Sequence, residues 1–322
     1  MKYFEEKFFF NYPISMIWEL TNSCVSRCIY CSGGFANKDK TRELSTQEKK
    51  NVVKDLINNK IYAINLSGGE PFLCNELEWI VDELTNNEIK VMIATTGLVY
   101  NEELLKKFCN NPFVSFNISL DSFNVEINDL HRGYEGTVYQ IEKFIEAVNT
   151  FGNGRTFVAL ECVLTQKNIG SIDEYLEKAK NLSLSEIRFQ SVVAMNENTF
   201  ANNLNITEQQ RIEAKTKIAE WSLKIKDKHI NFVDQSYTIK VSFRKGRNWG
   251  GIMSPEGDLM VSAYLPYIFG NIRDEGSLKA MWDKGFSRAW LNPKIFDEVE
   301  RIHTIKDIED LCKKYEWKKI RL

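Results

Sequence analysis

The sequence has few of the residues on which several common chemistries depend. Its 322 residues include three histidines, which lie far apart in the chain at His131, His229 and His303. A hydrolytic triad or a histidine-rich metal site therefore has no support. The net charge is −2, which gives no reason to expect a nucleic-acid partner bound through its phosphates. No Walker or Rossmann glycine pattern occurs either.

Long hydrophobic runs are also missing. No stretch approaches the roughly 20 apolar residues of a membrane-spanning helix, and residues 1–12 contain no signal-peptide core. Seven cysteines are an odd number, and in a chain of this length they argue against a disulfide scaffold. We therefore expect a soluble, cytoplasmic protein with neither a membrane nor a nucleic-acid partner.

The first two thirds of the chain alternate between short apolar runs and amphipathic stretches. The runs with strand composition lie at 14–20, 63–66, 90–94, 114–120, 156–164 and 186–190. The helical patterns lie at 46–58, 75–86, 101–109, 137–150 and 171–182. Ser45 or Thr46 can cap the first helix, and Ser171 with Glu174 forms a capping-box pattern. The alternation predicts a partial (β/α)6 TIM-like barrel with ligands at the carboxyl ends of its strands, and a doubly wound open sheet is the alternative.

The pattern changes after residue 200. Thr207 and Gln210 form a capping-box pattern that opens a long helix to about Asp227. Later residues form short β-like runs separated by glycines, and residues 308–320 have helical spacing. The predicted domains are an N-terminal extension at 1–12, a barrel at 13–200, a linking helix at 201–230, and a small β-rich extension with a terminal helix at 231–322.

Three of the cysteines stand close together, after the first predicted strand. Cys24, Cys28 and Cys31 have the spacing C-x3-C-x2-C. Three thiolates suit a metal centre with one open position, such as a [4Fe–4S] cluster that leaves one iron free. A structural zinc ion takes four protein ligands, and no fourth cysteine is near in the sequence. Zinc completed by a remote ligand, or plain buried thiols, are the alternatives.

The triplet, with Tyr30 before its third cysteine, resembles the signature of the radical S-adenosylmethionine superfamily. The resemblance implies that Cys24, Cys28 and Cys31 hold one [4Fe–4S] cluster whose free iron binds S-adenosylmethionine. It implies that one electron, from an external donor such as flavodoxin or ferredoxin, cleaves this cofactor. The 5′-deoxyadenosyl radical formed then takes a hydrogen atom from the substrate.

Small and polar residues near the ends of other predicted strands extend this resemblance. Ser67, Gly68, Gly69 and Glu70 resemble the GGE motif that holds the methionine amino group, although alone they also suit a strand-to-helix turn. In the same way, the resemblance implies cofactor contacts for Tyr30, Thr96, Ser119, Asp121, Arg132, Gln190 and Val192. An ordinary barrel-rim residue is the alternative for each one taken singly.

The run from 249 to 282 resembles the SPASM/twitch extension of radical enzymes that modify peptides and proteins. In that extension, the matching region carries cysteines for auxiliary clusters. Here, Asn248, Trp249 and Ser262 stand where cysteines would be expected, and the next cysteine is Cys312. We therefore predict an extension without an auxiliary cluster.

These patterns predict a radical enzyme that matures a ribosomally made precursor peptide by a crosslink, an epimerisation or a thioether. A radical enzyme acting on a small metabolite, such as a nucleotide or a sugar, is the alternative, and a non-catalytic zinc module is a remote one. The isolated cysteines are expected to be buried thiols. Among them, Cys162 on the fifth predicted strand is the candidate hydrogen donor to a substrate radical.

Overall fold

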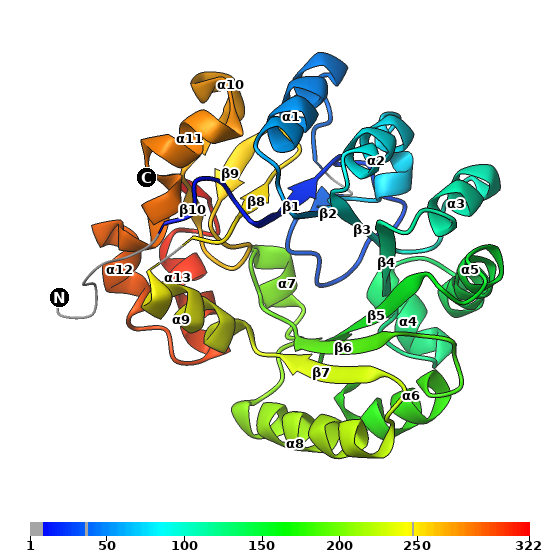
Figure 1. Cartoon of the computed structure of the whole chain (residues 1–322). Helices are drawn as coiled ribbons and strands as arrows, with labels where there is room; N and C mark the ends of the chain where they lie inside the picture. The colour runs from blue at the N-terminus through cyan, green and yellow to red at the C-terminus, as the bar shows by residue number, and fades with distance from the viewer. Residues whose placement is uncertain (1–8, 36–37, 247) are drawn as a thin grey trace.

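The protein, seen here as a computed structural model, is built around a parallel sheet that curves into an open barrel (Figure 1). The structure describes residues 9–35, 38–246 and 248–322, so most of the predicted N-terminal extension lies outside the described residues. The barrel strands are β1 (Ser15–Glu19), β2 (Ala63–Ser67), β3 (Lys90–Thr95), β4 (Val114–Ser119), β5 (Phe157–Leu164), β6 (Glu186–Ser191) and β7 (His229–Val233).

The order of these strands decides between the two predicted folds. From β1 to β7 they lie side by side in sequence order, and every pair is parallel. A doubly wound sheet reverses its strand order at a switch point, and this sheet does not. The partial TIM-like barrel is therefore confirmed. The barrel stays open because, among the described residues, β7 pairs with β6 alone, while β1 pairs on its far side with a strand of the C-terminal extension.

Helices cover the outside of the barrel. They are α1 (Thr46–Asn58), α2 (Leu77–Asn86), α3 (Glu102–Cys109), α4 (Val125–Arg132), α5 (Thr137–Phe151) and α6 (Ile172–Ala179), with 3₁₀ turns at Pro71–Leu73 and Ile169–Ser171. Ser45 forms a capping box with Glu48 at the start of α1. Ser171 makes no side-chain cap hydrogen bond, so the capping box predicted there is wrong. The 3₁₀ turn at Ile169–Ser171 leads directly into α6 and takes the place of that cap.

The strands alternate between a face toward the helices and a face toward the barrel interior. On β5, Leu160 and Cys162 are buried under the helices, whereas Glu161 and Val163 are partly exposed on the other face. The helix-facing side chains join Trp18, Phe116 and their neighbours in one hydrophobic core. The interior face is instead rich in polar residues, so polar side chains are available at the carboxyl ends of the strands.

The barrel continues beyond residue 200, the end predicted for it. After α7 (Glu197–Ala201), the helix α8 (Glu208–Lys224) begins with the predicted capping box of Thr207 and Gln210. It lies beside α6, where Lys217 and Trp221 both contact Asp173, at 2.6 and 2.8 Å. Strand β7 then adds to the sheet edge, so α8 covers the barrel and is more than a linking helix.

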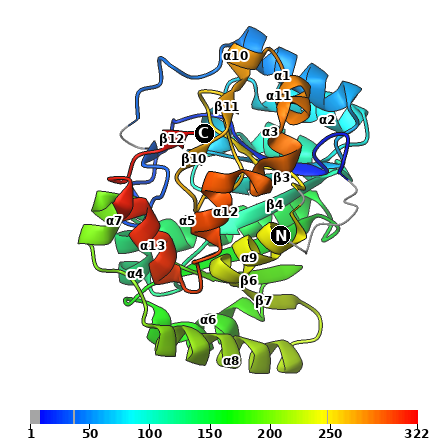
Figure 2. The same ribbon diagram turned by 90° about the vertical axis from the view of Figure 1, so that its left-hand side faces the viewer.

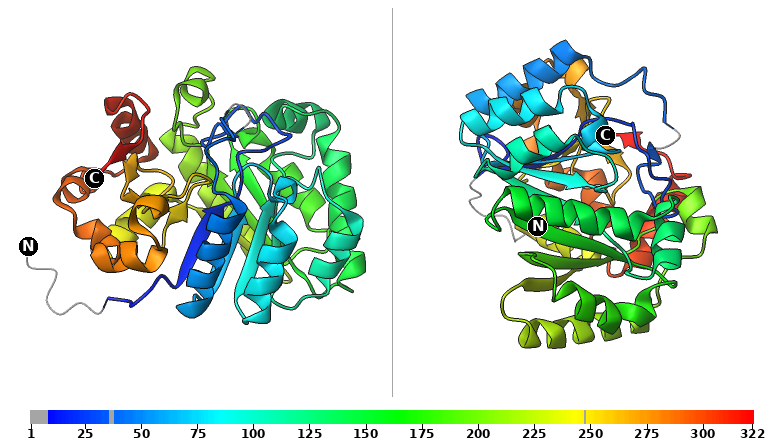
Figure 3. Two further views of the ribbon diagram at one scale, coloured as in Figure 1. Left: turned by 90° about the horizontal axis from the view of Figure 1, so that it is seen from above. Right: turned by 90° about the vertical axis from the view of Figure 1, so that its right-hand side faces the viewer.

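The C-terminal extension packs on one side of the barrel and contains more helix than predicted (Figure 3). Its strands are short: β8 (Ile252–Met253), β9 (Asp258–Met260), β10 (Tyr267–Ile268), β11 (Gly270–Asn271) and β12 (Ile320–Arg321). Its helices are α9 (Gln235–Lys245), α10 (Ile272–Glu275), α11 (Leu278–Lys284), α12 (Pro293–Val299) and α13 (Ile305–Lys314), with a 3₁₀ segment at Phe286–Leu291. The prediction that β-like runs follow the long helix is wrong for α9, whose first turn is capped by the Asp234 carboxylate.

Two contacts tie the extension to the barrel. Strand β8 pairs in parallel with β1 and forms a hairpin with β9. Helix α13 lies next to α7 (Figure 2), and its Glu309 accepts a hydrogen bond from the Ala194 amide at 2.9 Å. Among the described residues, no helix is both long and apolar enough to cross a membrane.

Candidate active site

A cavity of about 460 Å³, here called the cysteine cavity, opens at the carboxyl ends of the barrel strands. It brings together the loop after β1, the ends of β2 to β6 and the segment that leads into α7. The functional part of its lining comprises Cys24, Cys28, Tyr30, Cys31, Ser67, Gly68, Gly69, Thr95, Thr96, Ser119, Arg132, Val163, Gln190, Val192 and Tyr264. Residues far apart in the sequence thus share one site at the end of the barrel where such folds bind ligands.

The cysteine loop is held by backbone hydrogen bonds to the end of α4. The Arg27 amide donates to the Arg132 carbonyl at 2.8 Å, and the Ile29 amide donates to the His131 carbonyl at 3.1 Å. From the far side, the Asn202 side chain donates to the Ile29 carbonyl at 2.9 Å. The loop therefore has a fixed path before any ligand binds.

Two glycines after β2 let this loop come close. The amide of Gly69 donates to the Thr21 carbonyl at 2.7 Å. A Cβ atom on Gly69 would lie 2.1 Å from the Ser23 carbonyl oxygen, and one on Gly68, whose φ is +117°, would lie 2.8 Å from the Thr21 oxygen. No side chain fits at these distances, so the two glycines are needed to seat the cysteine loop.

The three thiols fit an iron–sulfur cluster better than a single metal ion. Cys24, Cys28 and Cys31 are free and line the same cavity, yet the described residues include no group of three His, Cys, Asp or Glu placed around one ion. A cluster takes one thiolate at each of several irons, so its ligands need not meet at one point. Burial raises the pKa of Cys24 to about 12, and it raises that of Cys28 to about 11 against the opposing charge of Arg132. A positive metal centre would be needed to keep these sulfurs deprotonated.

A buried ion pair stands beside the second cysteine. The Arg132 Nη2 atom lies 2.9 Å from Asp121 Oδ2, and its Nη1 lies 3.9 Å from Cys28 Sγ. The Tyr30 hydroxyl donates to Asp121, and its ring lies beneath the guanidinium. Burial favours the protonated form of Asp121, but the charge of Arg132, the nearby His131 ring and the hydrogen bond from Tyr30 outweigh it and hold the pKa below the usual range. The pair thus fixes a positive group at the cavity wall.

The carboxylate of Glu70 is turned away from the cavity. It is fully buried and accepts from Thr95 Oγ1 at 2.7 Å, the Thr96 amide at 2.8 Å and Thr96 Oγ1 at 2.6 Å. Burial raises the pKa of Glu70, although these hydrogen bonds oppose the rise. Glu70 therefore ties the end of β3 to the turn after β2, and Thr95 and Thr96 face the cavity in its place.

The other predicted site residues divide into two groups. All the predicted cofactor contacts line the cavity except Glu70 and Asp121, which support the residues that do. Cys162, the candidate hydrogen donor, is 1% exposed on the helix-facing side of β5, and its thiol donates to the Asp121 carbonyl at 3.4 Å. This position gives Cys162 no access to the cysteine cavity. Cys74, Cys109 and Cys312 are buried as predicted.

A network of hydrogen-bonded polar side chains inside the barrel was not predicted from the sequence. Glu161 accepts from the side chains of Asn117 and, at 2.6 Å, Gln190. Gln190 in turn accepts from the Tyr264 hydroxyl of the extension at 3.0 Å. A signal did exist, because polar residues recur at every second position of β4 and β6, and Glu161 interrupts the otherwise apolar β5. The partnership with Tyr264 joins distant parts of the chain and had no local signal.

Comparisons with known proteins agree with this geometry. The family model described as the radical SAM superfamily matches residues 18–190, more than half of the chain. That span runs from the first barrel strand to Gln190 and includes all three cysteines of the cavity.

The chain is similar to curated proteins over part of its length in one case and over nearly all of it in another. The mycofactocin maturase MftC of Mycolicibacterium smegmatis is 32% identical over 163 residues, which is 51% of this chain and 41% of the relative. The chain thus matches less than half the length of that maturase. The AdoMet-dependent heme synthase of Methanosarcina barkeri is 22% identical over 330 residues, which is 96% of this chain and 90% of the relative.

A solved structure shares the fold over nearly the whole chain. Streptococcus suis SuiB, bound to its precursor peptide SuiA, superimposes with a TM-score of 0.69 at 12% identity. The superposition covers 92% of this chain and 68% of SuiB. The likeness therefore extends beyond the barrel and includes the C-terminal extension.

Proposed function

The chain belongs to the radical SAM superfamily, and on that premise we propose that it modifies a ribosomally made precursor peptide by radical chemistry. The family uses a [4Fe–4S] cluster and S-adenosylmethionine. When bound, these cofactors supply a carbon-centred radical by reductive cleavage of S-adenosylmethionine, and the rest of the work falls to residues of this chain.

The observation that carries the proposal is the cysteine cavity itself. Three free thiols, a guanidinium held by a buried carboxylate and two glycine turns line one cavity at the carboxyl ends of the strands. We assign Cys24, Cys28 and Cys31 as the cluster ligands. The name of the mycofactocin maturase and the peptide-bound SuiB fold support a peptide as the substrate.

The cavity walls suggest how the chain orients its cofactor. Arg132 would contact the carboxylate of S-adenosylmethionine, since Asp121 holds its guanidinium in position at the cavity wall. Ser67, Gly68 and Gly69 would face the methionine portion, with Thr96 and Ser119 as hydrogen-bonding groups on the next strands. Glu70 and Asp121 act as positioning residues, because their carboxylates are occupied by neighbouring side chains.

The finer chemistry also belongs to this proposal. Hydrogen abstraction from the peptide would lead to a crosslink, an epimerisation or a thioether, with the electron supplied by a flavodoxin or a ferredoxin. The seven cysteines are free in the structure, which suits a reducing compartment, and we place the enzyme in the cytoplasm.

A second candidate function is modification of a small molecule. The heme synthase relative supports it, because that match covers nearly all of both chains. The peptide remains our first choice because the MftC match has the higher identity and the SuiB likeness includes the extension. One experiment separates the peptide substrate from the small-molecule substrate.

The test combines cofactor cleavage with peptide modification. Protein reconstituted without oxygen is expected to hold about four irons per chain and to form 5′-deoxyadenosine when given a reductant. Short peptides encoded beside the gene, co-expressed with the enzyme, are then analysed by mass spectrometry, with growth in D₂O to reveal epimerisation. Cys28→Ala is expected to abolish both activities.

Cys109→Ala is the matched control, because Cys109 is a buried thiol on α3 outside the cavity. It is expected to retain iron and activity. Peptide modification that persists in Cys28→Ala would contradict the cluster assignment. Cofactor cleavage without any modified peptide, together with turnover of a porphyrin, would favour the second candidate.

A further inference from the structure

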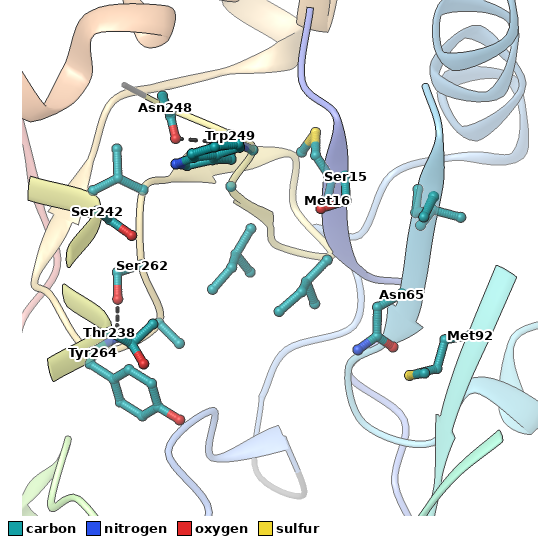
Figure 4. A pocket seen from close by; sticks show the side chains of 18 of the residues that line it. Ser15, Met16, Asn65, Met92, Thr238, Ser242, Asn248, Trp249, Ser262 and Tyr264 are labelled. Atoms are coloured by element: carbon teal, nitrogen blue, oxygen red, sulfur yellow. Dashed lines mark hydrogen bonds between the residues drawn. The ribbon is translucent and has the colours of Figure 1, made fainter. Parts of the chain in front are cut away.

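A second cavity, of about 570 Å³, lies at the opposite end of the barrel from the cysteines. One wall consists of the first residues of β1 to β4, and the other consists of α9 and the segments 248–252 and 261–264 of the extension. In Figure 4, Asn65 and Met92 lie on the barrel side, while Asn248, Trp249 and Ser262 lie on the extension side. These last three residues stand where the SPASM/twitch resemblance would place cysteines. The proposed function assigns no role to them.

The walls of this cavity are suited to an uncharged, bulky group. Met92 and Ile17 from the barrel face Trp249 and Trp290 from the extension. The charged side chain in the lining, Lys90, is exposed, and its ammonium donates to the Tyr62 hydroxyl at 2.7 Å. Apolar walls without a dedicated counter-charge favour an aliphatic or aromatic occupant over an ionic one.

The polar part of the lining does not select a charged or strongly hydrogen-bonding occupant. The Oδ1 atom of Asn65 has no hydrogen-bond partner among the described residues, but it is buried beneath the cavity surface, so an occupant does not reach it. The cavity therefore offers mainly shape and apolar surface, which an apolar side chain of a peptide can fill.

The second cavity and the cysteine cavity meet at one residue. Tyr264 lines both cavities, and its hydroxyl donates to Gln190, which lines the cysteine cavity. A peptide residue held in the second cavity would therefore leave its neighbours in the chain close to Tyr264 and the polar interior. This arrangement suits a pocket that recognises one residue of a substrate and so fixes which neighbour reacts.

We propose that the second cavity binds a bulky apolar residue of the peptide substrate, with the side chain between Met92 and Trp249. The proposal rests on the proposed function and specifies the substrate: the residue recognised is apolar and lies near the modified position. A small-molecule substrate would need no such pocket away from the cysteines.

The test uses the side chain of a single residue as a probe. N-Acetyl-L-phenylalaninamide is titrated into reconstituted protein whose methionine methyl groups carry ¹³C, and NMR follows the signals. The Met92 signal is expected to shift, whereas that of Met281, buried in α11 outside both cavities, is expected to stay. N-Acetylglycinamide, which lacks the side chain, is expected to bind at least about tenfold more weakly.

Two substitutions on one helix provide the matched variants. Ser242 lines the cavity from α9, so Ser242→Trp would fill it and weaken probe binding at least about tenfold. Arg244→Trp places the same ring on an exposed position of that helix and is expected to leave binding unchanged. Ser242→Leu, a smaller change, is expected to give an intermediate loss and guards against a folding defect in the tryptophan variant.

The outcomes separate this proposal from the proposed function. A Met92 signal that ignores the probe, or binding that survives Ser242→Trp, overturns the pocket even when wild-type protein still forms 5′-deoxyadenosine. Protein that forms no 5′-deoxyadenosine overturns the proposed function whatever the NMR result. With both intact, Ser242→Trp is expected to modify less peptide than Arg244→Trp does at the same content of bound iron.

Discussion

The two cavities of this barrel are built by different means. In the cysteine cavity, the loop that carries the cysteines is held by backbone, because its amides and carbonyls contact the end of α4 and the turn after β2, where two glycines leave no room for side chains. The second cavity is formed by side chains, with methionine, isoleucine and tryptophan from both the barrel and the extension. Backbone packing of this kind tolerates little change, whereas a cavity lined by side chains can be reshaped by substitution.

The difference suggests a division of labour. The end of the barrel that carries the cofactor needs one fixed geometry, and fixed geometry comes from groups that every residue has. The end near the extension needs to fit one particular substrate, and specificity comes from side chains. Substitutions in each region, and at the junction between them, test whether the two ends of the barrel differ in this way.

Gly69→Ala is expected to have the largest effect. Its Cβ would come within 2.1 Å of the Ser23 carbonyl oxygen, so the cysteine loop has to move. We expect the iron content and the rate of 5′-deoxyadenosine formation to fall at least about tenfold, with a loss of roughly 1–3 kcal/mol in the free energy of unfolding. Iron analysis and chemical denaturation measure the two effects.

Gly170→Ala is the control for this prediction. Gly170 lies in the 3₁₀ turn before α6, and a Cβ atom there would meet nothing within 4 Å. We expect wild-type iron content in this variant. A Gly69→Ala protein with full iron content would show that the cysteine loop is adaptable, and the contrast between the two cavities would fail.

How well the sequence predicts each part of the protein depends on whether that part is determined by local spacing. The strands, the helices α1 to α3 and the cysteine triplet depend on local spacing, so their positions were close to those in the structure. Cys162 was placed correctly on β5, but its distance from the cavity follows from which face of the strand it occupies. Glu70 matched a motif, yet its carboxylate is used by Thr95 and Thr96, which belong to a different strand.

The parts that could not be predicted depend on contacts between distant segments. No local pattern places Tyr264 against Gln190 or Asn65 opposite Trp249, because each pair joins the barrel to the extension. Helix α9 was missed because its first turn depends on one capping carboxylate, while its sequence is rich in residues that also suit strands.

Tyr264→Phe tests the boundary between the cavities and is expected to have a moderate effect. Burial raises the pKa of Tyr264 to about 12, so its hydroxyl remains a neutral donor to Gln190. Phenylalanine keeps the ring as a wall but removes that hydrogen bond, which is worth about 1 kcal/mol or severalfold in an equilibrium. We expect the ratio of 5′-deoxyadenosine to modified peptide to rise severalfold, measured by chromatography of both products.

Tyr237→Phe removes a hydroxyl from an exposed ring on α9 and is the control for that change. Its product ratio is expected to match the wild type. An unchanged ratio in Tyr264→Phe would mean that the two cavities work independently, whereas a lower rate of cofactor cleavage without peptide would place Tyr264 in cofactor binding.

Glu48→Gln is expected to have the smallest effect, because it alters a partly exposed contact between the two regions. The Glu48 carboxylate lies 2.5 Å from Arg273 Nε, and Arg273 also donates to the Glu43 carbonyl, at the end of the cysteine loop, at 2.9 Å. Glutamine can still form the capping box with Ser45, so the substitution removes mainly the charge. The expected loss is about 0.2–1 kcal/mol in the free energy of unfolding at neutral pH.

The pH dependence identifies the source of that loss. The hydrogen bond from Arg273 is the main cause that lowers the Glu48 pKa to about 2, from an ordinary value of about 4.3 in unfolded chains. A carboxylate with a lowered pKa stabilises the fold above the unfolded value, and this contribution disappears as the pH falls toward 2. Urea denaturation of the wild type and Glu48→Gln is therefore expected to give a difference at pH 7 that narrows between pH 5 and pH 2. A difference independent of pH would assign the effect to packing, and the extension would then be joined to the cysteine loop without help from charge.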